Sequence, residues 1–264
     1  MPKIHQKMIV KFKQASIFYT DKGQGSCVVL LHGFLENSTM WKTIEDTLVK
    51  KNRVISIDLL GHGKTGCIGY IHTMDEMTEA VKAVLKKLRI RKITLIGHSM
   101  GGYVSLAFAE KYPKFIKKIC LLNSTAQADN EARKKLRLRA NKMAQENYKA
   151  LVQMSISNLF AASVREDLSD IIQEVKNHAL QTSVRGYIAG SDGMRLRENK
   201  EMVLQSIEKR LLITGKEDAI LPYKMIVEEA ERTNTPLVTL PNGHMSHLEA
   251  TTALIAVLNK FIKG

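Results

Sequence analysis

Short apolar runs and amphipathic stretches follow one another along this chain. The apolar runs predict strands, because strands buried on both faces are apolar and rich in β-branched residues. The stretches predict helices, because their apolar residues recur at helical spacing. Strands are predicted at residues 8–12, 15–19, 28–31, 53–57, 92–96, 118–122, 211–214 and 237–240, and helices at 38–50, 75–88, 103–112, 223–232 and 246–262. This alternation predicts an α/β fold with a parallel sheet covered on both faces. At the amino-terminal end, the turn-forming Asp21–Gly25 predicts a hairpin with a longer loop.

A helical block interrupts the alternation between the strands at 118–122 and 211–214. Asn130–Tyr148 is rich in helix-favouring residues, and further helices are predicted around 164–172 and 174–191. Helices inserted between two strands of a parallel sheet would lie at one end of that sheet. The chain is therefore predicted to have a core (residues 1–124 and 201–264) and a helical cap, or lid (residues 125–200).

Composition favours a single α/β domain, or one domain with an inserted subdomain, in a reducing compartment. The chain has 264 residues, of which 44% are hydrophobic and 25% charged. No apolar run approaches the roughly 18–20 residues of a membrane span. Met1–Phe12 carries three lysines and lacks the apolar centre of a secretory signal. The three cysteines have no C-x-x-C spacing, so a cytoplasmic location is expected.

The net charge of +14 is the unusual feature of the composition. We interpret it as a solvated basic surface, because the chain has no zinc-ligand pattern, recognition helix or aromatic platform for nucleic acid. The densest basic patch lies between Asp129 and Ala150, with seven positive and three negative side chains. Its position in the predicted cap would favour anionic substrates. The sequence is compatible with a homodimer.

The candidate nucleophile is Ser99, within Gly97-His98-Ser99-Met100-Gly101-Gly102. This is a G-x-S-x-G stretch with a predicted strand before it and a predicted helix after it. Such a nucleophile elbow presents a serine hydroxyl on a sharp, strained turn, and its glycines let the strand and helix approach each other. The sequence context makes the motif much more specific than its letters alone.

A serine hydroxyl needs a base, and the base needs an orienting acid. His244 follows the last predicted strand, where the carboxyl ends of parallel strands converge, and is the favoured base among eight histidines. His247 is the alternative base, although local hydrogen bonding is the favoured role for it. Asp218 follows the strand at 211–214 and is favoured as the acid over Glu217. Asn123, after the strand at 118–122, cannot hold the charge.

Attack on a carbonyl also requires N–H donors for the developing oxyanion. One is expected from Met100, the residue after the nucleophile. The other is expected from Phe34, because Gly33 lets the chain turn after the strand at 28–31. His32 is interpreted as a structural tie within this loop.

Several stretches together resemble the α/β-hydrolase fold enzymes, in the esterase-like branch that carries a lid. They are Leu31–Phe34 with Trp41, Asp58–Thr65, Gly97–Gly102, Gly215–Asp218 with Pro222, and Gly243–Glu249. The resemblance implies an eight-stranded, mostly parallel sheet with a helical cap, a Ser99–Asp218–His244 triad, and an oxyanion hole from Phe34 and Met100. It also implies that Asp58–Thr65 is a structural turn.

The nucleophile and the expected pocket wall lead to one main function and two alternatives. A serine nucleophile argues against family members that attack through aspartate. An apolar wall of Phe34, Leu35, Met100, Met143, Leu151, Met154 and Phe160 suits short-to-medium acyl esters. We therefore predict a carboxylesterase that acts on a small-molecule ester through an acyl-serine, with no metal or cofactor. The first alternative is a lyase or carbon–carbon hydrolase whose anionic substrate is held by arginines among Arg133–Arg139, or by Arg195 and Arg197. The second is a receptor-like protein with little turnover.

Overall fold

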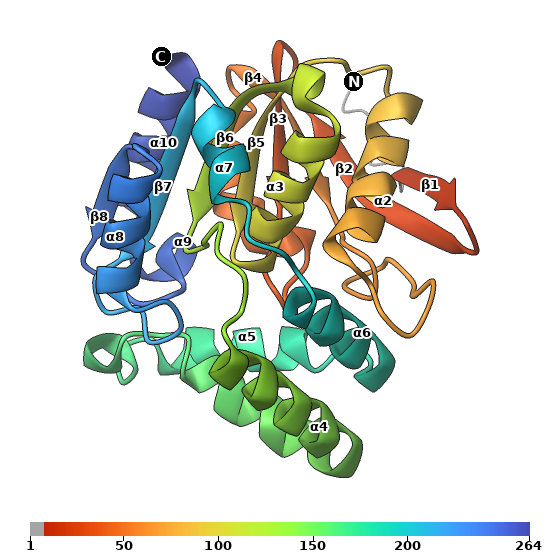
Figure 1. Cartoon of the computed structure of the whole chain (residues 1–264), viewed down its shortest axis with the longest axis vertical. Helices are drawn as coiled ribbons and strands as arrows, with labels where there is room; N and C mark the ends of the chain where they lie inside the picture. Colours follow the sequence, from red (N-terminus) through yellow and green to blue (C-terminus); the bar gives the residue numbers. More distant parts are fainter. Residues whose placement is uncertain (1–7) are drawn as a thin grey trace.

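In the computed structural model, which describes residues 8–264, eight strands form one sheet in the order β1-β2-β4-β3-β5-β6-β7-β8 (Figure 1). The two amino-terminal strands pair antiparallel, and all pairings from β4 to β8 are parallel. This confirms the predicted mostly parallel sheet. The strands are β1 (Met8–Phe12), β2 (Ala15–Lys22), β3 (Ser26–Leu31), β4 (Asn52–Ile57), β5 (Ile93–His98), β6 (Ile116–Leu122), β7 (Arg210–Gly215) and β8 (Leu237–Leu240).

Helices cover both faces of the sheet, because its central strands are apolar on both sides. Every residue of β5 is buried. One hydrophobic cluster joins the sheet to α2 (Met74–Lys87) and α3 (Met100–Lys111), and a second joins it to α1 (Lys42–Leu48) and α10 (Thr251–Lys263). The remaining elements of the core are η1 (Ser38–Trp41), η2 (Pro113–Phe115), α7 (Glu201–Ser206), α8 (Tyr223–Arg232) and α9 (Ser246–Glu249).

The predicted hairpin loop at Asp21–Gly25 is wrong. The hairpin of β1 and β2 closes at residues 13–14, where Lys13 takes a positive φ of 51°. Asp21 belongs to β2, and its carboxylate accepts two hydrogen bonds from Arg53 of β4 at 2.8 and 2.6 Å. β2 therefore continues to Lys22, and the glycines that follow lead to β3, which lies beyond β4.

The segment between β6 and β7 is helical, and we call residues 125–200 the cap segment. It contains α4 (Glu131–Ser157), η3 (Ala162–Val164), α5 (Ser169–Ala179) and α6 (Val184–Arg195). In Figure 1 these helices lie together at one end of the sheet, below the carboxyl ends of its parallel strands.

Several helix boundaries differ from the prediction. The helix predicted at 174–191 is broken at residues 180–183, because Ser183 caps α6 by accepting a hydrogen bond from the Gly186 N–H. The helix predicted at 164–172 overlaps only the start of α5. The helix predicted at 130–148 continues to Ser157, with a kink at Asn147. The predicted helices at 38–50 and 246–262 each begin as a separate short helix.

The cap segment leaves and rejoins the core through two chain segments that are bonded to each other. The Arg197 guanidinium lies 2.7 Å from the Asp129 carboxylate, and the Lys200 N–H donates to the Ala126 carbonyl at 2.7 Å. We call these paired segments the neck; they are residues 124–130 and 197–200.

Within residues 8–264, no helix is long and apolar enough to cross a membrane. His5, one of the eight histidines considered above, and the first seven residues of the basic amino-terminal segment lie outside the described residues.

Candidate active site

Ser99 occupies a strained turn between β5 and α3. Its φ of 48° and ψ of −115° are unfavourable for a residue with a side chain. A Cβ atom on Gly97 would collide with the backbone of Gly101, and one on Gly101 would collide with the backbone of Leu31. The glycines on either side of Ser99 therefore permit the close approach that exposes its hydroxyl.

Ser99, His244 and Asp218 come together at the carboxyl ends of β5, β8 and β7. The Ser99 Oγ lies 2.9 Å from His244 Nε2, and His244 Nδ1 lies 2.7 Å from Asp218 Oδ2. A carboxylate only accepts, so Nδ1–H donates to Asp218 and Nε2 is left to accept the proton of the serine hydroxyl. The side chains of His244 and Asp218 are both buried.

Local hydrogen bonds hold the Asp218 carboxylate in its ionised form. Its Oδ1 accepts from the N–H groups of Ile220 and Leu221 at 2.8 and 2.9 Å. Burial alone would raise the pKa of Asp218, but His244 and these N–H groups outweigh burial and bring the pKa below its ordinary value. The neighbouring Glu217 is exposed and accepts instead from Ser163. Asp218 is therefore the carboxylate that contacts the histidine.

Asn123 contacts the Asp218 carboxylate, and sequence reasoning missed this contact. Its Nδ2 donates to Asp218 Oδ2 at 3.1 Å and to the Gly243 carbonyl at 3.2 Å, and its Oδ1 accepts from Ser246. Sequence reasoning weighed Asn123 only as a substitute for the acid, and a neutral amide cannot fill that role. Its position at the end of β6, beside the ends of β7 and β8, was the signal available for a supporting contact.

The loop that carries His244 is held by Glu249 of α9. The Glu249 carboxylate accepts from the N–H groups of Gly243 at 3.0 Å and Met245 at 2.9 Å. It therefore bonds the residues on both sides of His244, and this limits the backbone movement of that residue.

The other histidines near the site have different partners. His247 Nε2 lies 3.3 Å from Glu36 Oε1, so its partner is distant in sequence and not local as expected. His32 accepts from the Leu59 N–H at 2.8 Å and donates to the Gly33 carbonyl at 2.7 Å, as expected of a structural tie. Asp58 accepts from the N–H groups of Ser38 and Lys64, which agrees with a structural turn.

The two expected oxyanion donors lie in the loop after β3 and at the start of α3. Phe34 lines the cavity that contains Ser99, and Met100 is the first residue of its helix. The first N–H groups of a helix have no acceptor within the helix and are available to a ligand. The pairing of Phe34 and Met100 as an oxyanion hole stays a prediction.

A cavity of about 460 Å³ lies between Ser99 and the cap segment. Its wall is mainly apolar, and its residues include Phe34, Leu35, Tyr103, Leu136, Met143, Leu151, Met154 and Tyr187. Met100 and Phe160, expected in this wall, are buried elsewhere, and Phe160 belongs to the hydrophobic core of the cap segment. An apolar residue of the cap segment faces either that core or the cavity, and sequence alone did not distinguish the two.

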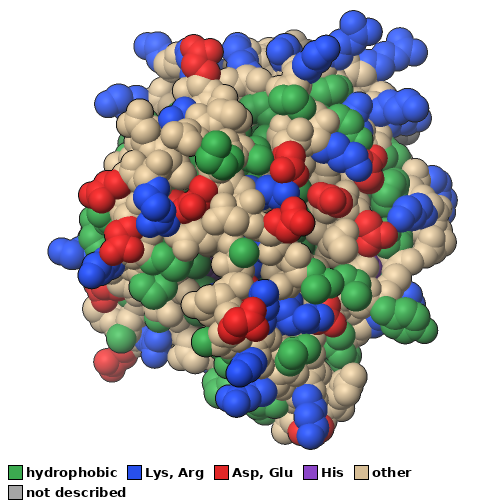
Figure 2. Space-filling view, in the orientation of Figure 1, with side chains coloured by type: hydrophobic (Ala, Val, Ile, Leu, Met, Phe, Trp, Pro, Cys, Tyr) green, Lys and Arg blue, Asp and Glu red, His purple; other side chains and the backbone are tan. Residues whose placement is uncertain are grey.

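Three arginines of α4 also line this cavity: Arg133, Arg137 and Arg139. Figure 2 shows Lys and Arg side chains interspersed with apolar ones over the part of the surface where Figure 1 draws α4. The Asp129 carboxylate accepts a hydrogen bond from Arg137 at 2.5 Å and forms an ion pair with Arg197 at 2.7 Å, whereas Arg133 lies 3.9 Å away. One carboxylate therefore faces several guanidinium groups. Arg195 and Arg197, the other arginines expected to bind an anion, do not line this cavity.

The structure combines a parallel sheet, a serine on a strand-to-helix elbow, and a histidine and a carboxylate within hydrogen-bond reach. This combination is typical of a class of hydrolases with a serine at the elbow. A family model described as "alpha/beta hydrolase fold" matches residues 27–251. The chain therefore belongs to the α/β-hydrolase fold family.

Individual relatives agree with this family. A solved esterase from Thermogutta terrifontis, determined with malate bound, superimposes with a TM-score of 0.91 at 27% identity, over 98% of both chains. The dihydrolipoyllysine-residue acetyltransferase component of the acetoin cleaving system from Pseudomonas putida is 30% identical over 90% of this chain. This chain spans only 64% of that protein. The (E)-2-((N-methylformamido)methylene)succinate hydrolase of Acinetobacter baylyi is 22% identical over 88% of both chains.

Proposed function

We propose that this protein is a carboxylesterase that cleaves esters of short-to-medium acyl chains through an acyl-serine intermediate. The observation that carries the proposal is the pair of hydrogen bonds from Ser99 to His244 and from His244 to Asp218, 2.9 and 2.7 Å long. They supply a nucleophile, a base and an orienting acid at the floor of an apolar cavity.

In the proposed reaction, Ser99 Oγ attacks the ester carbonyl carbon while its proton passes to His244 Nε2. The oxyanion that forms accepts hydrogen bonds from the N–H groups of Phe34 and Met100. Its collapse breaks the bond to the leaving alkoxide, which takes the proton from His244. Water then gives a proton to His244 and attacks the acyl-serine, and the second collapse releases the acid and restores the Ser99 hydroxyl.

The cavity supports a substrate of modest size. About 460 Å³ accommodates a small organic molecule, and the apolar wall suits an acyl chain without charge. The proposed reaction uses the side chains of Ser99, His244 and Asp218 and two backbone N–H groups, so this proposal needs no metal or organic cofactor. The three cysteines form no disulfide, and this supports a reducing compartment such as the cytoplasm.

A panel of p-nitrophenyl esters with acyl chains of increasing length tests the proposal. Turnover should be fastest with the shorter chains and should be lost in Ser99→Ala, whereas Ser163→Ala, an exposed serine, should match wild type. A phosphonate ester should form one covalent adduct, at Ser99, detectable by intact-mass and peptide analysis. Absence of both turnover and adduct would overturn the proposal and favour a receptor-like role.

A second candidate is a hydrolase or lyase for an anionic substrate, and the arginines of α4 favour it. Arg133 and Arg139 line the cavity, and the nearby Asp129 carries one negative charge opposite Arg133, Arg137 and Arg197. A substrate carboxylate would find unneutralised guanidinium groups there. The malate in the Thermogutta terrifontis esterase and the succinate-derived substrate named for the Acinetobacter baylyi hydrolase are both dicarboxylates.

Matched substrates separate the two candidates. The nitrophenyl monoester of succinic acid and the neutral butyrate ester have the same acyl length and differ by one carboxylate. If the substrate is anionic, the monoester should have the higher kcat/KM, and Arg133→Met should remove that advantage by raising KM about 10-fold or more. Arg195→Met, outside the cavity, is the control. Equal kcat/KM values for the two esters would leave only the neutral esterase.

A further inference from the structure

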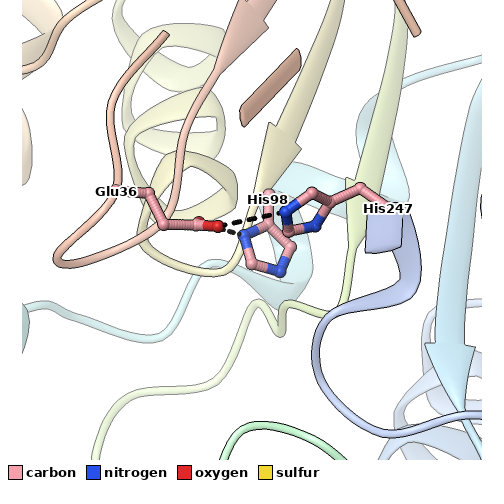
Figure 3. Close-up of side chains that lie close together, drawn as sticks. All are labelled: Glu36, His98 and His247. Atoms are coloured by element: carbon pink, nitrogen blue, oxygen red, sulfur yellow. Dashed lines mark hydrogen bonds and ion pairs between the residues drawn. The ribbon is translucent and has the colours of Figure 1, made fainter. Parts of the chain in front are cut away.

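Beside the proposed triad lies a second buried group of titratable side chains: Glu36, His98 and His247 (Figure 3). The carboxylate of Glu36 faces both imidazoles, whose ring centroids lie 5.3 Å apart. Its Oε2 is 2.8 Å from His98 Nδ1, and its Oε1 is 3.3 Å from His247 Nε2. Their side-chain hydrogen bonds and ion pairs go to groups other than Ser99, and the proposed reaction does not use them.

The partners of His98 determine its protonation state. Nδ1 faces the Glu36 carboxylate, and Nε2 lies 3.0 Å from the backbone carbonyl oxygen of His244. A carboxylate and a carbonyl oxygen only accept hydrogen bonds, so each ring nitrogen must carry a proton to donate one. His98 with two protons is an imidazolium, and Glu36 is the anion that compensates it.

The electrostatics of the surroundings agree with this buried ion pair. Burial alone would raise the pKa of Glu36, but His98 and the neighbouring histidines lower it to about 2. Burial alone would lower the pKa of His98, but Glu36 and the His244 carbonyl raise it above its ordinary value. Burial lowers the pKa of His247 to about 4, so this third ring is neutral. The titratable groups that face His98 are those of Glu36, His32, Asp218, His244 and His247.

The pair connects the three loops that must meet for hydrolysis. Glu36 Oε2 also accepts from the Gly33 N–H at 2.9 Å, and so fixes the loop that carries Phe34. His98 directly precedes Ser99 on the elbow. Through its Nε2–H, His98 bonds the backbone of His244 itself. A chain of hydrogen bonds therefore runs from the oxyanion loop, across the elbow, to the base.

We propose that Glu36 and His98 are positioning residues, which act as a carboxylate–imidazolium pair and hold the oxyanion loop, the nucleophile and the base in one arrangement. The protonation of His98 is independent of any activity. Its catalytic consequence rests on the proposed function. Because both nitrogens of His98 carry protons, neither has a lone pair for a metal ion, although three potential ligands lie close together.

The protonation state is measured directly on the wild-type protein. With ¹⁵N-labelled histidine, a long-range proton–nitrogen spectrum distinguishes a ring with two N–H groups from either neutral tautomer. The His98 signals are assigned by their loss in His98→Gln. We expect His98 to have both nitrogens protonated at pH 7, unchanged by a chelator. A neutral ring, or a spectrum that changes when metal is removed, would overturn the proposal.

Two substitutions of Glu36 separate charge from shape. Glu36→Gln keeps the size and loses the charge, whereas Glu36→Asp keeps the charge and is one methylene shorter. We expect the imidazolium to persist in Glu36→Asp and to disappear in Glu36→Gln. In Glu36→Gln, kcat on the preferred nitrophenyl ester should fall about 10- to 100-fold with little change in KM, because the reacting groups are misplaced and the pocket is intact. Glu174→Gln, on the exposed face of α5, removes the same charge and should match wild type.

The outcomes distinguish this proposal from the esterase proposal. If kcat follows shape, so that Glu36→Gln is more active than Glu36→Asp, the role of the charge is refuted. If the wild type hydrolyses no ester and forms no phosphonate adduct, but the His98 signals are those of an imidazolium, the esterase proposal fails and the buried pair stands.

Discussion

The carboxyl edge of the sheet and the wall provided by the cap segment differ in how firmly their side chains are held. At the sheet edge, Asp218 has four hydrogen-bond partners, and Glu36 is bonded to His98 and Gly33. In the wall, Met143 and Met154 are 42% and 54% exposed, and several arginines share one carboxylate. A site that must place a proton within a fraction of an ångström benefits from side chains fixed by several hydrogen bonds. A surface that must fit a substrate tolerates exposed and less constrained side chains. The contrast suggests that the edge determines the chemistry and the wall determines the substrate.

The largest expected effect is at the sheet edge, where substitutions of two nearby histidines can be compared. His244→Ala should lower kcat by about 10⁴- to 10⁶-fold, because Ser99 loses the base that takes its proton. His247→Ala should keep activity within about tenfold of wild type, because His247 contacts Glu36 and not the serine. Steady-state kinetics on the fastest ester measures both. Equal losses in the two variants would refute the assignment of His244 as the base.

The acid should have the next largest effect. Asp218→Asn keeps the shape but favours the wrong tautomer of His244, so kcat should fall by about 10⁴-fold. Glu217→Gln, on the adjacent exposed residue, is the matched control and should behave as wild type. If Glu217→Gln is the more damaging change, the acid has been assigned to the wrong residue.

The buried pair should also affect stability, in a pH window set by its two groups. The pKa of Glu36 is lowered to about 2, so its contribution is present above its ordinary pKa of 4.5 and is lost as the pH falls below that value. The pKa of His98 is raised, so its contribution is present below 6.5 and is lost as the pH rises through the folded-state pKa. Glu36→Gln should therefore reduce the free energy of unfolding most between pH 4.5 and 6.5, by about 3 kcal/mol. Urea unfolding at pH 5, 6 and 9 measures this, and a pH-independent loss would contradict the ion pair.

The smallest effect should come from the wall. Leu151→Ala enlarges the cavity, so the preference should move toward longer acyl chains, by about 3- to 10-fold in the ratio of kcat/KM values. Leu138→Ala, on the exposed side of the same helix, should leave the ratio unchanged. If Leu151→Ala lowered kcat on all esters by orders of magnitude, the separation of chemistry from substrate fit would be lost.

Sequence reasoning succeeded where a signal is local and failed where it depends on contacts between distant residues. The elbow around Ser99 could be predicted because its glycines, strand and helix are neighbours in the chain. Glu36 has no such signal, because its partners are 62 and 211 positions away. The break before α6 was missed because a single capping serine, Ser183, ends a stretch that is otherwise favourable for a helix. Whether Phe160 points into the core of the cap segment or into the cavity depends on how the helices of that segment pack together. The spacing of apolar residues within one helix does not determine this packing.

The neck is one of several attachments between the cap segment and the core. The ion pair between Asp129 and Arg197 and the bond between Lys200 and Ala126 clasp the outgoing and returning segments together. Beyond the neck, the cap segment is also bonded to the core by the His72 N–H, which donates to the Ala189 carbonyl, and by the His244 N–H, which donates to the Leu159 carbonyl. A movement of the cap segment away from Ser99 would therefore have to break these bonds, and a substitution at Asp129 would loosen only one of its attachments.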